Sequence, residues 1–185
     1  MPSIVIPAHN EERVLGPTLE SVLAGLDACV QVLVACNGCT DGTALLARRF
    51  APRVEVLEIE TASKTAALNA GDARARGFPR VYLDADVPIQ GAHLMRILAH
   101  LERPGALAAE PRPSFDFEGA GMLVRAYYAV WRGLHGARPG DVGCGLYALS
   151  AAGRARFEEF PAIIADDGYV RAHFAAGEIE LVEEA

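Results

Sequence analysis

Apolar and polar residues follow a repeating order through the first half of the chain. Short runs of β-branched and aliphatic residues alternate with longer segments whose apolar positions recur every three or four residues, and these two patterns are typical of strands and helices. Strands are expected at residues 3–7, 31–35, 54–59 and from 81 onward, with helices at about 14–23, 41–50 and 65–76 between them. Strands that alternate with helices predict an α/β fold with a mostly parallel sheet.

The pattern becomes less regular beyond residue 101. A segment rich in proline, glycine and arginine precedes an apolar helix expected from Gly119 to Leu134, and a last strand is expected at 178–182. The apolar residues of this helix have the spacing of one buried face: Met122, Leu123, Tyr127, Val130, Trp131 and Leu134. A lipid surface is the alternative partner for such a helix. Core packing is favoured because the helix lacks a strongly basic opposite face.

Composition and charge narrow the function classes. The 185 residues, 51% hydrophobic and 22% charged, fit one globular domain over residues 1–185. The net charge of −7 provides no positive field for nucleic acid, so we expect no nucleic-acid partner. The longest apolar run, Ala126 to Trp131, is far shorter than the roughly 20 residues of a transmembrane helix. The first residues lack a basic start and a long apolar stretch, so a cytoplasmic location is expected.

The four cysteines are too few and too irregularly spaced for a disulfide framework. Cys36 and Cys39 match the C-x-x-C pattern of zinc and redox sites. No second pair follows, however, and the Asn-Gly between them is typical of a tight turn. Free thiols are therefore expected at Cys29, Cys36, Cys39 and Cys144.

The strongest candidate for chemistry is the sequence Asp84-Ala85-Asp86, directly after a predicted strand. Two carboxylates one residue apart can hold a hard divalent cation, which in turn binds phosphate oxygens. A solvated turn is the alternative, because aspartate is common where strands end. The metal site gains support from Lys64, the only lysine beside 16 arginines, and from Asp41, because the loops after parallel strands meet at one edge of a sheet.

Four motifs, in this order, resemble those of family 2 glycosyltransferases. They are Ile4-Val5-Ile6-Pro7-Ala8-His9-Asn10-Glu11-Glu12, Asn37-Gly38-Cys39-Thr40-Asp41-Gly42-Thr43, Lys64-Thr65-Ala66-Ala67-Leu68-Asn69-Ala70-Gly71 and Asp84-Ala85-Asp86. The resemblance is strong from residue 3 to about 87 and weaker to about 174. It implies the GT-A fold, a Rossmann-like three-layer α/β/α sandwich, with a donor half at about 1–90 and an acceptor half at about 91–185.

The resemblance also implies roles for single residues. The positions that match the donor-nucleotide site are Pro7, Ala8, Asn10, Glu11, Asn37, Asp41, Lys64, Asp84 and Ala85. Asp84 is expected towards the ribose and Asp86 towards a Mn²⁺ or Mg²⁺ ion on the diphosphate. Cys36 and Asn37 stand where the family often has two acidic residues, so a contact to the base is altered or absent.

The catalytic residue that the resemblance implies is Asp167. Ala165-Asp166-Asp167 resembles the family's Glu-Asp motif, whose second residue takes the proton of the acceptor hydroxyl. Without that context, two aspartates before a glycine are more typical of a helix cap or a turn. His173 is a candidate late metal ligand, with a structural role as the more common alternative.

Two other patterns receive structural interpretations. The sequence Gly143-Cys144-Gly145-Leu146-Tyr147-Ala148 matches a dinucleotide fingerprint, but it lies too late in the chain, so a Gly-rich acceptor loop is favoured. His9 is assigned no chemistry, because three adjacent residues of an extended loop cannot all point inward.

The resulting hypothesis is a metal-dependent, inverting, non-processive glycosyltransferase. The expected donor is a uridine diphosphate (UDP) sugar, and the expected acceptor hydroxyl is either lipid-linked, which would place the protein against the inner face of the membrane, or small and soluble. The Q-x-x-R-W motif of processive members is missing. The rival hypotheses are a non-catalytic nucleotide-binding module that needs a partner, and a nucleotidyltransferase, whose usual glycine- and arginine-rich first loop is absent.

Overall fold

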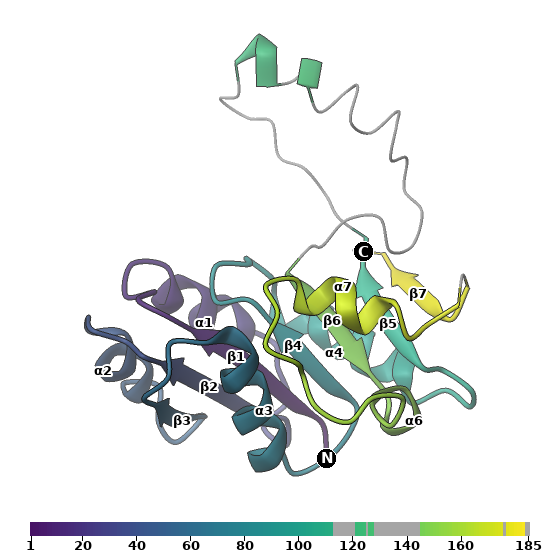
Figure 1. Cartoon of the computed structure of the whole chain (residues 1–185), viewed down its shortest axis with the longest axis horizontal. Coiled ribbons are helices and arrows are strands. Elements are labelled where there is room, and N and C mark those ends of the chain that lie inside the picture. The colour runs from purple at the N-terminus through teal and green to yellow at the C-terminus, as the bar shows by residue number, and fades with distance from the viewer. Residues whose placement is uncertain (113–120, 125, 128–144, 176, 184–185) are drawn as a thin grey trace.

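The computed structural model describes residues 1–112, 121–124, 126–127, 145–175 and 177–183. Its centre is a seven-stranded sheet with the strand order β3-β2-β1-β4-β6-β5-β7 (Figure 1). The strands are β1 (Ser3–Ala8), β2 (Gln31–Asn37), β3 (Val54–Ile59), β4 (Arg80–Leu83), β5 (Ala108–Pro111), β6 (Leu146–Leu149) and β7 (Ile179–Val182). Neighbouring strands are parallel except where β6 pairs antiparallel with β4 and β5. The mixed α/β architecture confirms the fold class predicted from the alternation of strands and helices.

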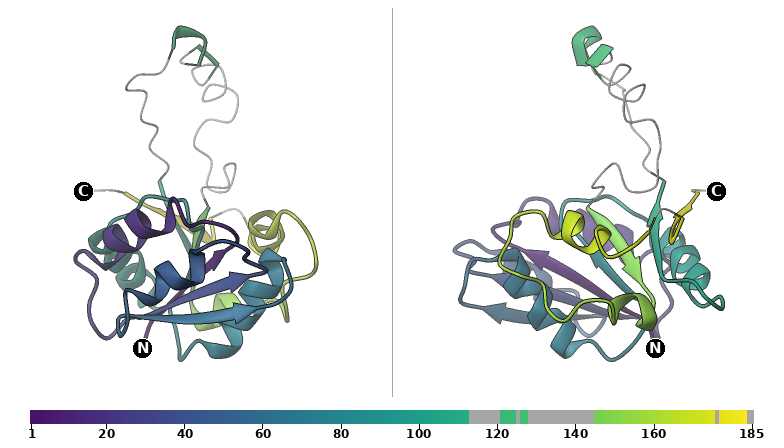
Figure 2. Two further views of the ribbon diagram at one scale, coloured as in Figure 1. Left: turned by 90° about the vertical axis from the view of Figure 1, so that its left-hand side faces the viewer. Right: turned by 45° about the vertical axis from the view of Figure 1, so that its right-hand side comes forward.

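Helices cover both faces of the sheet (Figure 2). They are α1 (Leu15–Leu23), α2 (Thr43–Arg48), α3 (Lys64–Arg74), α4 (Gly91–Leu101), α6 (Ala151–Arg154) and α7 (Asp166–Arg171). Successive side chains of a strand point to opposite faces, so Ile4 and Ile6 of β1 join the core beneath α1, α2 and α4, whereas Val5 joins the core beneath α3 and α7. The three layers therefore follow from largely apolar central strands, β1 and β2, that are buried on both faces.

The strand β6 is a difference from the sequence prediction, which placed a Gly-rich loop at residues 143–148. Residues 143 and 144 lie outside the described part of the chain, but Leu146–Leu149 forms a fully buried strand. Gly145 precedes it with a φ of 65°, and its carbonyl accepts a hydrogen bond of 2.7 Å from the Asp84 amide. A Cβ at residue 145 would lie 2.6 Å from Val87 Cγ2, so this glycine permits a close backbone approach beside Asp84.

The helix expected at 119–134 lies only partly within the described residues, of which 122–124 and 126–127 are helical. The prediction that this helix packs its apolar face against the core is wrong for those residues. Met122, Leu123 and Tyr127 are 84%, 85% and 63% exposed, because this segment stands away from the layered body (Figure 1). Within the described ranges, no helix has the length and apolar character needed to cross a membrane.

The close contact between α3 and β1 gives a stability prediction. A Cβ on Gly71 of α3 would lie 2.3 Å from Val5 Cγ1, and Val5 is fully buried. Gly71→Ala is therefore expected to lower the free energy of unfolding by about 1–3 kcal/mol through overpacking, as measured by urea denaturation. Gly16→Ala in α1 is the matched control, because its Cβ would meet Leu46 at an ordinary 3.6 Å. Equal stability of the two variants would contradict this account.

Candidate active site

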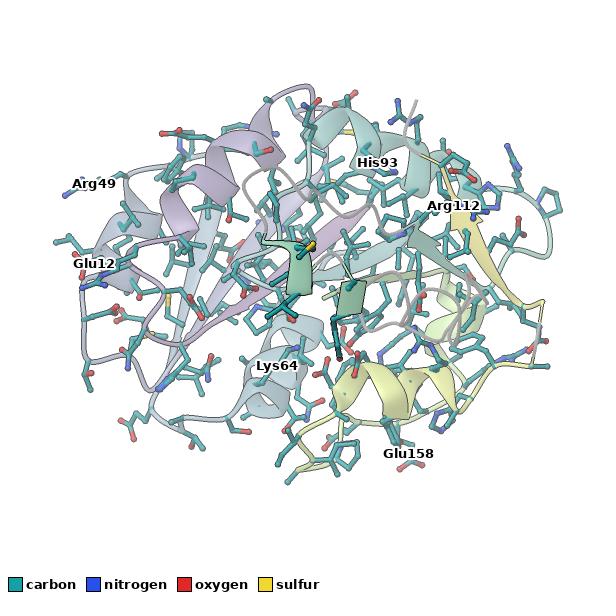
Figure 3. All side chains as sticks on the ribbon, turned by 90° about the horizontal axis from the view of Figure 1, so that it is seen from above. Glu12, Arg49, Lys64, His93, Arg112 and Glu158 are labelled. Carbon is teal, nitrogen blue, oxygen red and sulfur yellow. The ribbon has the colours of Figure 1, made fainter. Side chains whose placement is uncertain are left out.

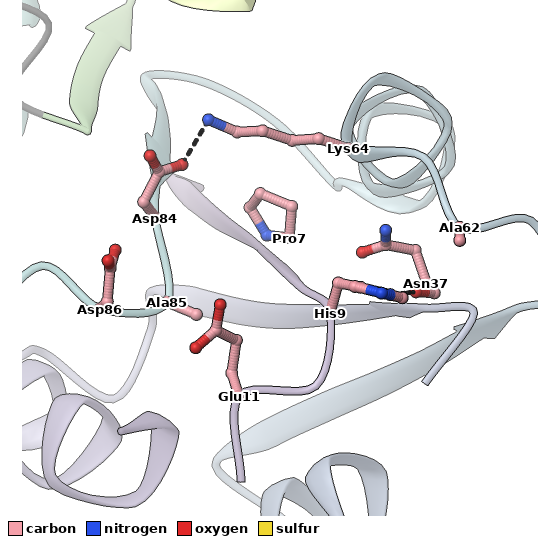
Figure 4. Close-up of a pocket in the computed structure, with 9 residues that line it drawn as sticks. All are labelled: Pro7, His9, Glu11, Asn37, Ala62, Lys64, Asp84, Ala85 and Asp86. Carbon is pink, nitrogen blue, oxygen red and sulfur yellow. Dashed lines mark hydrogen bonds and ion pairs between the residues drawn. The ribbon is translucent and has the colours of Figure 1, made fainter. Parts of the chain in front are cut away.

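The carboxyl ends of the parallel strands form a pocket of about 390 Å³. The pocket lies at the edge where loops after β1, β2, β3 and β4 meet, as expected for an open α/β sheet. Its lining comes from the ends of these four strands and from the segments that follow them: Pro7, His9, Glu11, Asn37, Ala62, Lys64, Asp84, Ala85 and Asp86 (Figure 4). Of the residues predicted for the donor site and the metal, the pocket lining therefore includes Pro7, Glu11, Asn37, Lys64, Asp84, Ala85 and Asp86.

Lys64 is the charged centre of the site. Its Nζ lies 2.6 Å from Asp84 Oδ1 and 3.0 Å from Asp166 Oδ1. Figure 3 shows Lys64 at the start of α3, beside the C-terminal helix α7. Burial alone would lower the pKa of Lys64, but the hydrogen bonds and charges of Asp84 and Asp166 outweigh it, so the pKa is raised. Lys64 is therefore a permanent cation between the loop after β4 and α7.

Glu11 and Asp86, the other two carboxylates of the pocket lining, have no ion-pair partner among the described residues. Asp86 is exposed and makes no hydrogen bond or ion pair with any residue in the described ranges, while Glu11 approaches it from the first loop (Figure 4). Burial, then the charges of Asp86 and Asp41, raise the pKa of Glu11. Burial also raises the pKa of Asp84, against the opposing effect of Lys64. The pocket is thus an acidic site whose electrostatics favour an added cation.

The donor set suits a hard divalent ion that is completed by a ligand. The described residues contain no group of three or more His, Cys, Asp or Glu side chains placed to hold a metal. Mg²⁺ and similar ions bound beside phosphates often take only one or two protein carboxylates, because phosphate oxygens and water fill the other positions. Asp86 and Asp84 would supply those carboxylates here.

Asn10 and Asp41 hold two loops together and do not line the pocket. Asn10 has a φ of 57°, and its Oδ1 accepts a hydrogen bond of 2.8 Å from the Thr40 amide. Asp41 accepts hydrogen bonds from the Thr43 hydroxyl and amide at 2.5 and 3.0 Å, and the hydroxyl contact lowers the pKa of Asp41. Thr43 Oγ1 in turn accepts from the Glu11 amide at 2.8 Å. These contacts fix the backbone that presents Glu11 to the pocket.

Asn37 has a similar bracing role at the end of β2, although it also borders the pocket. In the amide orientation that satisfies both groups, Nδ2 donates to the Ala8 carbonyl at 2.9 Å and Oδ1 accepts from the Ser63 amide at 3.2 Å. Ala8, also predicted for the donor site, is buried and contributes its backbone to this contact. The Asn37 side chain therefore joins the loops after β1, β2 and β3.

Two residues of the pocket lining, His9 and Ala62, were not predicted from the sequence, and of these His9 has the polar side chain. Its Nδ1 lies 2.5 Å from the Asn37 carbonyl, which requires a proton on Nδ1, and its ring lines the pocket. The positive φ of Asn10 turns that residue away, so His9 and Glu11 face the pocket on either side of it. Successive side chains of an extended loop point to opposite sides, so His9 and Glu11 could have been expected on one side and Asn10 on the other.

The acidic pair at the start of α7 divides into two environments. Asp166 is 3% exposed, and besides Lys64 it accepts a hydrogen bond of 3.2 Å from the Tyr147 hydroxyl. Asp167 is more accessible, and its Oδ1 accepts from the Gly168 amide at 2.7 Å. His173 lies at the far end of α7, where Nδ1 bonds the Tyr169 carbonyl at 2.8 Å and the ring packs against Tyr169 and Phe157.

Solved structures with a similar fold include glycosyltransferases. One is the mannosyltransferase PcManGT from Pyrobaculum calidifontis, in complex with GDP-Man and Mn²⁺. The superposition covers 98% of this chain and 56% of the PcManGT chain, with a TM-score of 0.71 and 20% sequence identity. Glucosyl-3-phosphoglycerate synthase from Mycobacterium tuberculosis, in complex with UDP, matches 99% and 69% respectively, with a TM-score of 0.71 and 21% identity. These similarities show that the fold is GT-A.

Curated relatives agree at the level of sequence. Dodecaprenyl-phosphate galacturonate synthase from Rhizobium johnstonii is 29% identical over 109 residues, 55% of this chain and 32% of the relative. Glycosyltransferase AglE from Haloferax volcanii is 28% identical over 131 residues, 68% of this chain and 43% of the relative. The chain thus spans less than half the length of either relative. The family model for glycosyl transferase family 2 matches residues 3–143, and the chain belongs to that family.

Proposed function

We propose that the protein is a divalent-cation-dependent glycosyltransferase that moves a sugar from a nucleoside diphosphate, with UDP as the favoured nucleotide, to an acceptor hydroxyl. The observation that carries this proposal is the acidic pocket at the carboxyl edge of the sheet, where Glu11, Asp84 and Asp86 surround a space beside Lys64. A diphosphate with its cation matches this mixture of charges. Relatives with the same fold have been solved with UDP or GDP-Man and with Mn²⁺, which supports the same class of donor.

Asp86 and Asp84 would hold the cation, Mn²⁺ or Mg²⁺. When bound, the cation would offset the negative charge that develops on the departing diphosphate. Lys64 would lie beside the same group as a second positive charge. The His9 ring would form one wall of the nucleotide site, because it lines the pocket. The side-chain amide of Asn37 also borders the pocket, but it is already hydrogen-bonded to Ala8 and Ser63.

Asp167 is proposed as the general base. It would take the proton of the acceptor hydroxyl as that oxygen attacks the anomeric carbon. The bond from this carbon to the diphosphate breaks, and its electron pair leaves with the nucleoside diphosphate. Direct displacement of this kind inverts the anomeric configuration. Asp167 is suited to the role because, unlike Asp166, its carboxylate is not engaged by Lys64.

Two acceptor classes are supported by the names of relatives. One relative is a dodecaprenyl-phosphate galacturonate synthase, which supports a lipid-linked acceptor and a position at the membrane surface. Another relative is a glucosyl-3-phosphoglycerate synthase, which supports a small soluble acceptor. A single sugar addition fits both classes.

Thermal unfolding with a panel of nucleoside diphosphates, each with and without Mn²⁺ or Mg²⁺, tests the donor site. We expect one diphosphate to stabilise the protein only when the cation is present, by about 2.7 kcal/mol at a hundredfold excess over its dissociation constant. The corresponding sugar nucleotide should then release that diphosphate as its sugar passes to an added acceptor or, more slowly, to water. No stabilisation by any nucleotide would overturn the proposal. Binding without turnover would favour the non-catalytic module, and release of pyrophosphate from a nucleoside triphosphate and a sugar phosphate would favour a nucleotidyltransferase.

A further inference from the structure

Side chains on one face of α3 are hydrogen-bonded to the chain segment that leads from α6 to α7. The Asn69 side-chain amide bonds both backbone groups of Phe160: Nδ2 donates to the Phe160 carbonyl at 3.0 Å, and Oδ1 accepts from the Phe160 amide at 2.9 Å. This is the pairing that a neighbouring strand would give, here supplied by a side chain 91 residues away in sequence. Phe160 is itself 3% exposed, so these backbone groups would otherwise be costly to bury.

A second contact lies three residues further along the same face of α3. Asp72 Oδ2 accepts a hydrogen bond of 2.6 Å from Arg154 Nε at the end of α6. The Arg154 guanidinium also donates to the carbonyls of Phe157 and Glu158 at 2.6 and 2.7 Å, and it lies 4.2 Å from the centre of the Phe157 ring. The segment from Arg154 to Phe160 is therefore held against α3 at two points.

The connection from this segment to α7 is aromatic. Phe157 contacts Phe160, Tyr169 and His173 with ring-centre distances of 5.2, 5.6 and 5.4 Å. The other end of α7 has a separate anchor, because Arg171 donates to Glu110 of β5 at 2.9 Å. The start of α7 is held directly by the contacts of Asp166 with Lys64 of α3 and with Tyr147, and it follows Phe160 by only six residues along the chain.

We propose that Asn69 is a positioning residue that fixes the start of α7, and with it Asp166 and Asp167, relative to the donor pocket. Asn69 does not line the pocket and has no contact with either aspartate among the described residues. Lys64 begins α3, and Asn69 of the same helix binds the backbone of Phe160. One helix therefore positions both the Lys64 cation and the chain segment that leads to Asp166 and Asp167. The catalytic part of this inference rests on the proposed function.

The test compares wild type, Asn69→Ala, Asn69→Asp and the control Arg74→Ala. Asn69→Ala removes both hydrogen bonds to Phe160, whereas Asn69→Asp keeps the acceptor and loses the donor. Arg74 lies on the same helix as Asn69, and Arg74→Ala removes its ion pair with Glu55 of β3. For each protein we would measure hydrogen exchange by mass spectrometry and binding of the stabilising diphosphate with Mn²⁺. We would also measure kcat and KM for release of that diphosphate from its sugar nucleotide, with water as the acceptor of the sugar.

In both Asn69 variants we expect faster exchange from Phe160 to about Gly168, unchanged exchange in β1 to β3, and unchanged affinity for the diphosphate. We expect kcat to fall roughly 10- to 100-fold with little change in KM, because a displaced reacting group loses alignment without loss of donor binding. Arg74→Ala should match wild type. If one Asn69 variant fails to fold, the other carries the comparison.

Three results would overturn the inference. The first is unchanged exchange at the start of α7, and the second is faster exchange there with unchanged kcat. The third is a fall in affinity that equals the fall in kcat, because the residue would then act through the donor pocket. Failure of wild type to bind any diphosphate would instead count against the proposed function, and hydrogen exchange would still decide whether Asn69 holds α7.

Discussion

Asp167→Asn is expected to slow sugar transfer by roughly 10²- to 10⁴-fold, the usual contribution of a general base, while donor affinity stays unchanged. Asparagine has nearly the same shape as aspartate but cannot accept the proton of a hydroxyl. Its side-chain oxygen can still accept the hydrogen bond from the Gly168 amide, so the start of α7 should keep its geometry. The measurement is turnover of the sugar nucleotide beside calorimetric binding of the diphosphate.

Two further variants make this result specific. Glu159→Gln changes an exposed carboxylate of the same segment and should leave turnover unchanged. Asp166→Asn removes the buried partner of Lys64 and Tyr147, so it should lower the midpoint of thermal unfolding as well as turnover. If Asp167→Asn retains full activity while Asp166→Asn is folded and inactive, the base is Asp166 and the assignment of Asp167 is wrong.

Asp86→Ala is expected to abolish the dependence of nucleotide binding on the cation without destabilising the free protein. Asp86 has no hydrogen-bond or ion-pair partner in the described part of the chain, and its charge is one reason that the pKa of Glu11 is raised. Removing it therefore relieves repulsion in the empty pocket while it removes a cation ligand. Unfolding midpoints with and without UDP and Mn²⁺ measure both effects.

Glu20→Ala, an exposed carboxylate on α1, is the charge-matched control and should retain the full stabilisation by UDP and Mn²⁺. A Mn²⁺-dependent rise in the unfolding midpoint that survives in Asp86→Ala would show that the cation is held elsewhere. A lower midpoint for the free Asp86→Ala protein would show that Asp86 has a structural partner, contrary to its described environment.

The first four strands were predictable because each strand and the helix that follows it have their own periodicity. The antiparallel strand β6 was not, because Leu146–Leu149 is a four-residue apolar run preceded by glycines. Such a run can be read as a loop or as a buried strand until its partners are known. Its partners are β4 and β5, and β4 lies more than sixty residues earlier in the chain.

The site was predictable to the extent that it follows from topology. Strand ends on one edge of a parallel sheet bring Lys64, Asp84 and Asp86 together whatever the loop details. Alternation along the first loop allows His9 and Glu11 to face the same side, but the local pattern does not specify the positive φ of Asn10 that accompanies this arrangement. The buried environment of Asp166 depends on its contacts with Lys64 and Tyr147, which lie far from it in the sequence, whereas Asp167 has neither contact.

Lys64 also gives the protein a built-in chemical reporter, because its ion pairs keep the amine protonated and slow to react until a bound ligand disturbs them. The chain contains one lysine, and its side chain is 39% exposed at the edge of the pocket. An amine-selective acylating reagent would therefore modify a single side chain, apart from the chain's amino terminus, and that side chain borders the proposed donor site. The extent of acylation at Lys64 could then be used to follow ligand occupancy by peptide mass spectrometry, with no engineered label.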